Sequence, residues 1–384
     1  MAENNPTSAA GRATARSACD GRATAIGRDG VTTTETVGAT PPTEAFDATT
    51  AKTGRTDKKL WTPPRVMLAP MAGYSDRAMR VVCAEWGAEY SVTEMISATA
   101  LCFGDKKTLA LAAIRQDEGN VGLQIFGKEP DRMAFAAHRL SQAVGEGFVP
   151  PTAIDVNMGC PVNKIFGNGE GSALMRSPEL IEKIVRAVNG ATHLPVTVKL
   201  RIGVDAAHIN AVECALAAEE GGAAMICLHG RTRVELYSGT VHREVIKNVN
   251  DNLHIPLIAN GDITSAADAL SMLRDTGAHG VAVGRGAVGN PFIFREILAA
   301  LDGGEFTPPS LATRCEVALR QLRLSIEEKG EYRAVNEARK QIALYLRGFR
   351  GAATLRAAIN TATTYAEVER VINDILAENA DEVT

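Results

Sequence analysis

Eight short runs of β-branched and other apolar residues follow one another from Val66 onward, each separated from the next by a longer segment of helical period. The runs are VMLAPM (66–71), YSVTEM (90–95), VGLQIF (121–126), AIDVNMG (153–159), VTVKLR (196–201), MICLHG (225–230), LIANG (257–261) and GVAVGR (280–285). Eight strand–helix units within about 235 residues fit a closed (β/α)8 TIM barrel, typically of roughly 250 residues, better than an open doubly wound sheet.

The segments between these runs predict helices. After the first run, Ala78, Met79, Val82 and Cys83 recur at three- and four-residue spacings, and Ser75 stands where a helix cap is expected. The same periodicity predicts helices over 131–145, 177–190, 206–221 and 264–276. We therefore expect a barrel domain over residues 61–308.

The residues on either side of the barrel differ from it in composition. Residues 309–384 predict a smaller all-helical domain, because Leu311, Cys315, Leu319 and Leu322 form one apolar stripe and no strand pattern follows. Residues 1–60 contain no leucine before Leu60 and are rich in Ala, Thr, Gly and Ser, so we expect a disordered N-terminal extension. Its arginines suggest a targeting peptide, but its interspersed acidic residues argue against one.

Composition and charge exclude several classes of protein. The seven cysteines include no C-x-x-C pair, which argues against a disulfide framework and a structural zinc site and favours a reducing, cytoplasmic compartment. No apolar run reaches the roughly 18 residues of a membrane span. With a net charge of -4, a nucleic acid would have to meet a locally basic surface. No obligate protein partner is expected.

Polar and charged residues gather where the predicted strands end. Active sites of (β/α)8 barrels lie at the C-terminal mouth, and barrel strands are otherwise apolar, so packing does not explain these residues. The candidates at this mouth are Glu94, Gln124, Asn157, Cys160, Lys199, Arg201, His229, Arg231, Asn260, Asp262 and Arg285.

Two glycine-containing segments, NGD (260–262) and GRG (284–286), follow the seventh and eighth predicted strands. In such barrels these loops bind phosphate through backbone N–H groups. GRGAVG (284–289) also matches G-x-G-x-x-G, but it follows the last strand and not the first, which argues against a dinucleotide fold. Lys199 and Gln124 at neighbouring strand ends suggest FMN as the ligand, while phosphorylated sugars would fit the two loops equally well.

A family resemblance rests on nine ordered segments. They are APMAGYSD (69–76), TEM (93–95), LQIFG (123–127), DVNMGCPVNK (155–164), GSALM (171–175), VKLRIG (198–203), LHGRTR (228–233), ANGDI (259–263) and VGRGAVGNPFIF (283–294). Together they resemble the tRNA-dihydrouridine synthases, most of all the bacterial B-type branch, over about residues 64–350. The resemblance implies an FMN-dependent barrel and a C-terminal helical tRNA-binding domain, with NADPH as the donor that reduces selected uridines of tRNA to dihydrouridine.

The resemblance also implies roles for individual residues. Cys160 matches the proton donor of the family. The FMN contacts would be Pro70, Met71, Gln124, Lys199, His229, Asn260, Gly261, Asp262, Gly284 and Arg285, and the residues near the uridine or its phosphates would be Asn157, Lys164, Arg201 and Arg231. In the helical domain, residues 332–356 carry six cationic side chains against Glu337 alone, and Arg339, Lys340 and Arg347 are predicted to contact tRNA.

The segment DVNMGCPVNKIFGNGEG (155–171) is the most specific of these motifs. Reduction of the uracil C5–C6 bond needs a hydride at one carbon and a proton at the other, and a thiol is mostly protonated at neutral pH. Pro161 disfavours a helical conformation at Cys160, so we expect the thiol on the extended exit of its strand. Lys164 is expected to point at RNA phosphate, because an ammonium group beside the sulfur would favour thiolate.

The glycines at the end of this segment are interpreted as conformational freedom for the loop to close over a bound nucleotide. No G-K-[ST] follows them, which excludes a phosphate-binding P-loop. Two other functions are compatible with the sequence. An FMN-dependent dehydrogenase of free pyrimidines, of the dihydroorotate or dihydropyrimidine type, would leave the basic helical domain without a role. A catalytically silent tRNA-binding protein would leave the polar strand ends unexplained.

Overall fold

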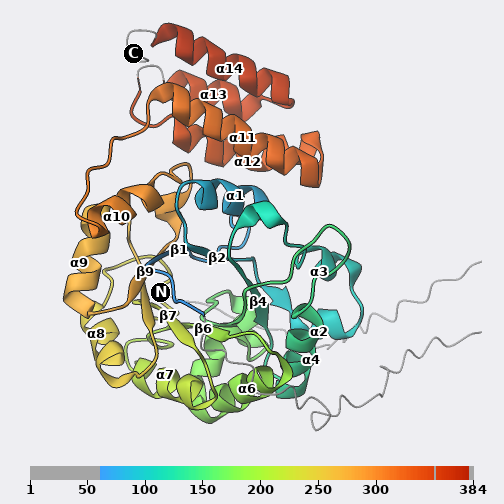
Figure 1. The fold of residues 1–384 in the computed structure, drawn as a ribbon, viewed down its shortest axis with the longest axis vertical. Coiled ribbons are helices and arrows are strands. Elements are labelled where there is room, and N and C mark those ends of the chain that lie inside the picture. The colour runs from blue at the N-terminus through green and yellow to red at the C-terminus, as the bar shows by residue number, and fades with distance from the viewer. Residues whose placement is uncertain (1–60, 350–351, 380–384) are drawn as a thin grey trace, which may run out of the picture. The chain divides into compact units, whose positions relative to one another are not determined.

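Eight parallel strands close into a barrel, as the sequence predicts (Figure 1). The computed structural model describes residues 61–349 and 352–379, so the predicted disorder of residues 1–60 lies outside the described residues. The strands are β1 (Val66–Leu68), β2 (Tyr90–Val92), β4 (Val121–Phe126), β5 (Ala153–Met158), β6 (Val196–Arg201), β7 (Met225–His229), β8 (Leu257–Asn260) and β9 (Gly280–Val283). Neighbours in this order pair in parallel, with β1 between β2 and β9, and the pairing of β2 with β4 closes the ring.

One further strand was not predicted. β3 (Ile96–Ser97) pairs with the end of β4, just beyond the point where β2 leaves it. The predicted run over 90–95 therefore pairs with β4 only as far as Val92, and pairing resumes at Ile96, just beyond the end of the run.

Helices connect the strands and surround the barrel (Figure 1). They are α1 (Arg77–Glu85), α2 (Ala98–Cys102), α3 (Lys106–Ala110), α4 (Pro130–Leu140), α5 (Asn163–Gly167), α6 (Pro178–Ala191), α7 (Ala211–Glu220), α8 (Arg243–Asn252), α9 (Ala266–Thr276) and α10 (Ile293–Leu301). Three 3-10 turns complete this part, namely η2 (Gln116–Glu118), η3 (Gly171–Arg176) and η4 (Arg285–Ala287).

Helix ends are where the sequence prediction needs correction. The N-cap of α1 is Asp76, whose Oδ1 accepts from the Met79 N–H at 3.0 Å, and the prediction of Ser75 was wrong. Ser75 is buried, and its Oγ accepts from the Met71 N–H at 2.9 Å, which shapes the loop after β1. The helix predicted over 206–221 begins only at Ala211, because the preceding residues fold back and pair Gly203 with Ile209.

The inside of the barrel is filled by side chains from the strands. Met67, Tyr90, Met225, Cys227 and Ile258 belong to one buried cluster. A Cβ at Gly122 would lie 1.9 Å from the Tyr90 Oη, so only glycine leaves room on β4 for that ring. Full burial of a large apolar side chain contributes about 1.5–3 kcal/mol, so this packing supports a rigid floor beneath the mouth.

Four helices follow the barrel in the described chain, namely α11 (Leu311–Lys329), α12 (Glu331–Tyr345), α13 (Ala352–Thr361) and α14 (Tyr365–Glu378). The predicted apolar stripe of α11 is buried. Several ion pairs join α11 to α1 and its N-cap, among them Lys329 Nζ 2.5 Å from Asp76 Oδ2 and Arg320 Nε 2.9 Å from Glu85. Among the described helices, none is both long and apolar enough to cross a membrane.

Candidate active site

The C-terminal ends of the barrel strands bring the predicted residues to one mouth. Because all eight strands are parallel, each ends at the same side of the barrel. The side chains come from β4 (Gln124), β5 (Asn157), β6 (Lys199 and Arg201), β7 (His229) and β8 (Asn260). The prediction that these residues share one face is confirmed, and what they bind there stays a prediction.

Cys160 lies between the end of β5 and the start of α5, outside any helix, as expected. Its N–H donates to Asn157 Oδ1 at 3.0 Å, and its carbonyl accepts from the Ser172 Oγ at 2.8 Å and the Ser172 N–H at 3.1 Å. A Cβ at Gly171 would lie 3.0 Å from the Cys160 Cβ, so this glycine lets η3 approach the cysteine. The backbone of Cys160 is therefore fixed on both sides.

The Cys160 thiol is suited to donate a proton. Burial raises the pKa of Cys160 above its ordinary value of 9.0, while a backbone hydrogen bond and the charge of Arg201 oppose this shift. A raised pKa keeps the sulfur protonated at neutral pH. Lys164 is exposed on α5, and it is not among the groups that shift the pKa of Cys160; its contact with RNA phosphate stays a prediction.

A chain of amide hydrogen bonds leads from Cys160 into the barrel. Asn157 Nδ2 donates to Gln124 Oε1 at 2.8 Å, and Gln124 Nε2 donates to Asp155 Oδ2 at 2.7 Å. Asp155 also accepts from Thr197 Oγ1 at 2.5 Å. Burial raises the pKa of Asp155 to about 6, against the lowering effects of Thr197, Gln124 and Lys199. The sequence analysis gave Asp155 no role, although a carboxylate inside an apolar strand is the signal that could have revealed it.

Lys199 and His229 are adjacent donors on β6 and β7. Lys199 Nζ donates to Asn260 Oδ1 at 3.2 Å, while Asn260 Nδ2 donates to the Ala282 carbonyl at 2.8 Å. Burial lowers the pKa of Lys199. Burial, and then the nearby cations, lower the pKa of His229 to about 2, so this imidazole is neutral. A neutral His229 can donate one hydrogen bond without adding charge to the mouth.

The two predicted phosphate loops lie after β8 and β9. Within the described part of the chain, the backbone N–H groups of Gly261, Asp262 and Gly284 donate to no backbone carbonyl. Arg285 adds an exposed guanidinium beside them. Free N–H groups on glycine-rich loops with a nearby cation make a donor set suited to a phosphate.

Pro70 and Met71 follow β1, on the side of the mouth that borders the second phosphate loop. A Cβ at Gly284 would be 3.7 Å from Met71 Sδ, so the two loops are neighbours. Both residues are partly buried. With the donors at the other strand ends, the residues present fit a flavin that carries one phosphate.

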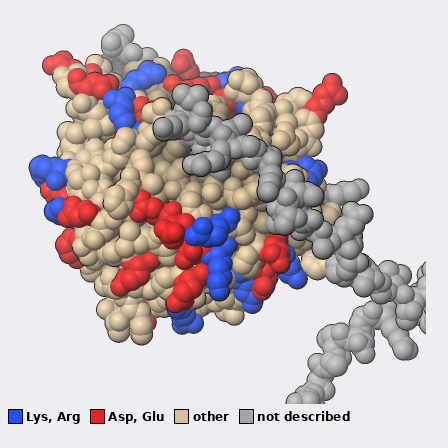
Figure 2. Space-filling view, turned by 60° about the horizontal axis from the view of Figure 1, so that its bottom comes forward, with Lys and Arg blue, Asp and Glu red and all other residues tan. Residues whose placement is uncertain are grey.

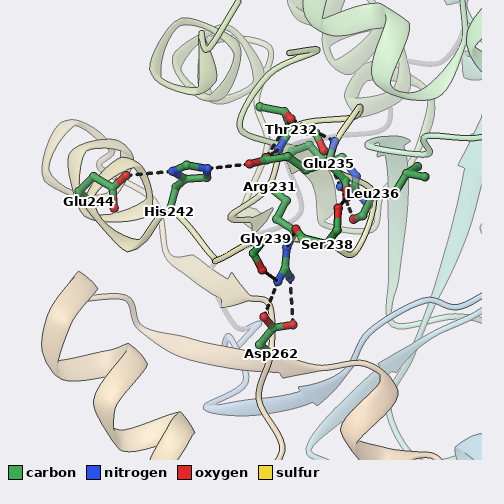
Figure 3. Close-up of polar contacts among 10 residues, drawn as sticks. Arg231, Thr232, Glu235, Leu236, Ser238, Gly239, His242, Glu244 and Asp262 are labelled. Atoms are coloured by element: carbon green, nitrogen blue, oxygen red, sulfur yellow. Dashed lines mark hydrogen bonds and ion pairs between the residues drawn. The ribbon is translucent and has the colours of Figure 1, made fainter. Parts of the chain in front are cut away.

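Arg231 and Asp262 form an internal ion pair (Figure 3). The buried Arg231 donates from Nη1 to Asp262 Oδ1 at 2.9 Å, from Nε to the Ser238 carbonyl at 2.8 Å and from Nη2 to the Gly239 carbonyl at 2.7 Å. The bond with Arg231 is the main reason that the pKa of Asp262 is lowered. In this structure the Arg231 guanidinium therefore ties the β7–α8 loop, residues 230–242, to the first phosphate loop.

Arg201 connects the same loop to the cysteine. Its Nη1 donates to the carbonyls of Thr232 at 2.8 Å and Leu236 at 3.0 Å, and its Nε donates to the Gly159 carbonyl at 3.1 Å. Tyr237, to which the sequence analysis gave no role, stands 55% exposed beside this group. Its ring lies 4.7 Å from the Arg285 guanidinium, 5.7 Å from that of Arg201 and 6.3 Å from the His229 ring.

The segment after Cys160 is also held at its far end. The Phe166 ring lies between Arg233 at 3.9 Å and Arg176 at 4.5 Å, and Arg233 Nη2 donates to Asn163 Oδ1 at 2.5 Å. Cation–π pairs of this kind contribute about 0.5–2 kcal/mol each. The glycines of this segment allow its turns, and the predicted closure over a nucleotide stays a prediction.

The predicted tRNA residues of the helical domain lie on and after α12. Arg339 is half-buried and donates from Nε and Nη2 to the Ala362 carbonyl, at 2.9 Å and 2.5 Å. Lys340 and Arg347 are exposed. The structure thus separates one cation that ties α12 to the α13–α14 connection from two that are free to meet solvent.

Figure 2 shows another side of the molecule, where cationic and anionic side chains are interspersed. On the outer helices, Arg186 pairs with Glu182 at 2.7 Å and Lys247 with Asp251 at 2.8 Å. Charges that cancel over such short distances produce no extended positive field. The described surface that is visible in this view therefore shows no broad basic patch.

A barrel whose polar groups converge on one mouth has the architecture of a (β/α)8-barrel enzyme. A family model described as dihydrouridine synthase (Dus) matches residues 67–381. The tRNA-dihydrouridine synthase B of Shewanella oneidensis is 38% identical over 284 residues, covering 73% of this chain and 86% of the relative. A probable tRNA-dihydrouridine synthase of Treponema pallidum is 35% identical, covering 80% and 92%. A probable tRNA-dihydrouridine synthase 1 of Synechocystis sp. is 40% identical, covering 76% and 81%. The chain belongs to the dihydrouridine synthase family.

Proposed function

We propose that this protein reduces selected uridines of tRNA to 5,6-dihydrouridine, with FMN as cofactor, NADPH as electron donor and Cys160 as the proton donor. The observation that carries the proposal is the hydrogen-bonded chain from Cys160 through Asn157 to Gln124, because it joins the proposed acid to a proposed flavin contact. Membership of the dihydrouridine synthase family supports the same reaction. A cytoplasmic location is part of this proposal.

Bound FMN, once reduced by NADPH, would supply the hydride that goes to one carbon of the uracil C5–C6 bond. Cys160 Sγ gives its proton to the other carbon, and solvent then protonates the resulting thiolate. Burial prepares this step, since it raises the pKa of the thiol. A positioned general acid typically contributes 10²- to 10⁴-fold in rate.

The other residues at the mouth bind and orient. Gln124 and the neutral His229 offer hydrogen bonds to the flavin edge, Lys199 offers a positive charge beside it, and the N–H groups of the two phosphate loops with Arg285 hold its phosphate. Asn157 holds the backbone of Cys160 in place, because its Oδ1 accepts a hydrogen bond from the Cys160 N–H. Arg201, already anchored to the β7–α8 loop, adds positive charge on the substrate side.

The helical domain is proposed to bind the tRNA backbone. Lys340 and Arg347 are exposed cations on and after α12, and Arg339 lies next to them. Each phosphate contact made by such a cation steepens the dependence of binding on salt, by about 0.7–0.9 per contact in the slope of log K against log salt concentration.

The proposal is tested by incubating the purified protein with NADPH and unmodified tRNA and mapping dihydrouridine by mass spectrometry. We expect dihydrouridine at discrete positions with the unchanged protein and a loss of at least about 100-fold in rate with Cys160→Ala. Reduction of free uracil or orotate without reduction of tRNA would favour a free-pyrimidine dehydrogenase. A colourless protein that binds tRNA and reduces nothing would indicate a silent tRNA-binding protein.

A further inference from the structure

The β7–α8 loop carries a carboxylate that joins its two ends (Figure 3). Glu235 Oε2 accepts from the Thr232 N–H at 2.6 Å and from Thr232 Oγ1 at 2.8 Å. Glu235 Oε1 is 2.9 Å from His242 Nε2, at the end of the loop. One side chain thus closes residues 232–242 into a ring of hydrogen bonds.

This ring fixes the two carbonyl groups that hold Arg201. Thr232 and Leu236 both accept from Arg201 Nη1, and the Nε of the same guanidinium donates to the Gly159 carbonyl, directly before Cys160. A displaced loop would therefore release Arg201 and withdraw its charge from the Cys160 sulfur.

The backbone of the loop is held in an unfavourable conformation. Leu236 has a φ of 53°, and it shares a positive φ with only one other non-glycine residue of the described chain, Asp262 at 49°. Both belong to the network of Figure 3, since Asp262 is the partner of Arg231. Such conformations persist only where surrounding contacts enforce them, and they are frequent at functional sites.

Tyr237 is an exposed aromatic residue of this loop, next to Leu236. Its ring is close to the cations of Arg285 and Arg201, and it stands beside the His229 ring. An exposed aromatic ring among cations at an RNA-binding mouth is suited to stack on a nucleotide. Its position depends on the backbone that Leu236 and Glu235 define.

We propose that Glu235 is a positioning residue of the active site, which holds Arg201 and Tyr237 in place for the RNA substrate by closing the loop between Thr232 and His242. The inference rests on the proposed function for its substrate. It does not require Glu235 to touch tRNA or cofactor.

The chain offers a matched control. His242 lies between two carboxylates, because its Nδ1 is 3.1 Å from Glu244 Oε1 while its Nε2 is paired with Glu235. Glu244 is 73% exposed on α8 and makes no contact with Thr232. Substitution of Glu244 removes a carboxylate from His242 and leaves the loop closed.

The experiment compares Glu235→Ala, Glu235→Gln and Glu244→Ala in the full chain. The first measurement is the rate of Cys160 alkylation by iodoacetamide across pH, resolved by peptide mass spectrometry. With Glu235→Ala we expect the midpoint of this profile at higher pH, because Arg201 no longer favours the thiolate. A change of access alone would scale the rate equally at every pH. The second measurement is steady-state reduction of tRNA, where KM should rise about tenfold and kcat change less.

Glu235→Gln should restore both readouts, because the glutamine Oε1 can accept from Thr232 while its Nε2 donates to a neutral His242. Glu244→Ala should match the unchanged protein. A profile and KM that stay unchanged in Glu235→Ala, or equal changes in Glu235→Ala and Glu244→Ala, would overturn the proposal. If Glu235→Ala does not fold, Thr232→Val takes its place and should shift the midpoint of the alkylation profile less, but in the same direction. An unchanged midpoint in Thr232→Val would also overturn the proposal. Failure of the unchanged protein to form dihydrouridine would refute the proposed function, while the alkylation profile would still test Glu235.

Discussion

The side-chain amide of Gln124 donates a 2.7 Å hydrogen bond to the buried carboxylate of Asp155. This bond fixes which way the Gln124 amide faces, because Nε2 turns toward Asp155 and Oε1 toward Asn157. The orientation of Asn157 and Gln124, which lie next to Cys160, is therefore determined by Asp155 in the interior of the barrel.

Asp155→Asn should stabilise the protein more at high pH than at low pH. Burial raises the pKa of Asp155 from 3.8 to about 6. Between these two pH values the folded state keeps a proton on Asp155 that the unfolded state has lost. The free energy of unfolding then falls as pH rises through this window, by at most about 3 kcal/mol, and asparagine removes the effect. Thermal unfolding of both proteins at pH 4.5 and pH 8 measures it. An increment in Tm that is equal at the two pH values would contradict the prediction.

Activity should persist into alkaline solution. An acid acts while it is protonated, and burial raises the pKa of Cys160 above 9.0, so its contribution is present at neutral pH and is lost only as pH rises through that higher value. The single-turnover rate of uridine reduction should have no falling limb due to Cys160 below about pH 9. Cys160→Ser should be slower and lack the alkaline limb, whereas Cys102→Ser should follow the unchanged profile. A limb centred well below pH 8 and abolished by Cys160→Ser would argue against the acid role.

Two glycine substitutions should have opposite effects on stability. Gly122→Ala places a Cβ 1.9 Å from the Tyr90 Oη, and overpacking of this kind costs about 1–3 kcal/mol. Gly190→Ala on α6 meets no atom within 4 Å, so it should stabilise by about 0.5–1 kcal/mol through helix propensity. Chemical denaturation measures both. Tyr90→Phe should recover part of the loss in Gly122→Ala, because it removes the closest atom, and no recovery would show that the clash is relieved elsewhere.

Arg339 and Lys340 are adjacent but should behave differently. Arg339→Ala removes two hydrogen bonds to the Ala362 carbonyl, so it should lower the Tm as well as weaken tRNA binding. Lys340→Ala should weaken tRNA binding and reduce its salt slope by about 0.7–0.9 while leaving the Tm and flavin binding unchanged. Binding titrations at several salt concentrations, beside thermal unfolding, separate the two effects. Equal losses of Tm in both variants would contradict this assignment.

The barrel was predictable because its signal is local. Eight apolar runs, each bounded by a helical segment, specify strands that have to be parallel, and the mouth residues follow from where each strand ends. The break between β2 and β3 was not predictable, because it depends on how β4 pairs on both sides of it. The cap at Asp76 was missed because serine and aspartate are both favourable there, and only tertiary contacts turn Ser75 toward Met71.

Long-range contacts explain what the sequence did not reveal in the site. Arg231 and Arg201 are both conspicuous in the sequence, yet their partners include carbonyls of a loop whose course no periodicity predicts. Tyr237 was missed for the same reason, since its neighbours Arg285 and His229 are distant in sequence. Asp155 was missed because it lies within a predicted strand. Its role as a hydrogen-bond acceptor becomes visible only from its buried partners Gln124 and Thr197.

The segment that follows the second phosphate loop, residues 288–292, packs directly against the helical domain. Gly289 has a φ of 69°, and a Cβ there would lie 2.4 Å from the Leu344 Cβ and 2.9 Å from the Leu344 carbonyl carbon on α12. Phe292, three residues later, packs edge-on against Tyr345 with ring centroids 6.3 Å apart. The helical domain consequently cannot be exchanged for that of a relative without changing these contacts. A chimera that takes α11–α14 from a relative would have a packing mismatch at this contact unless residues 288–292 came from the same donor.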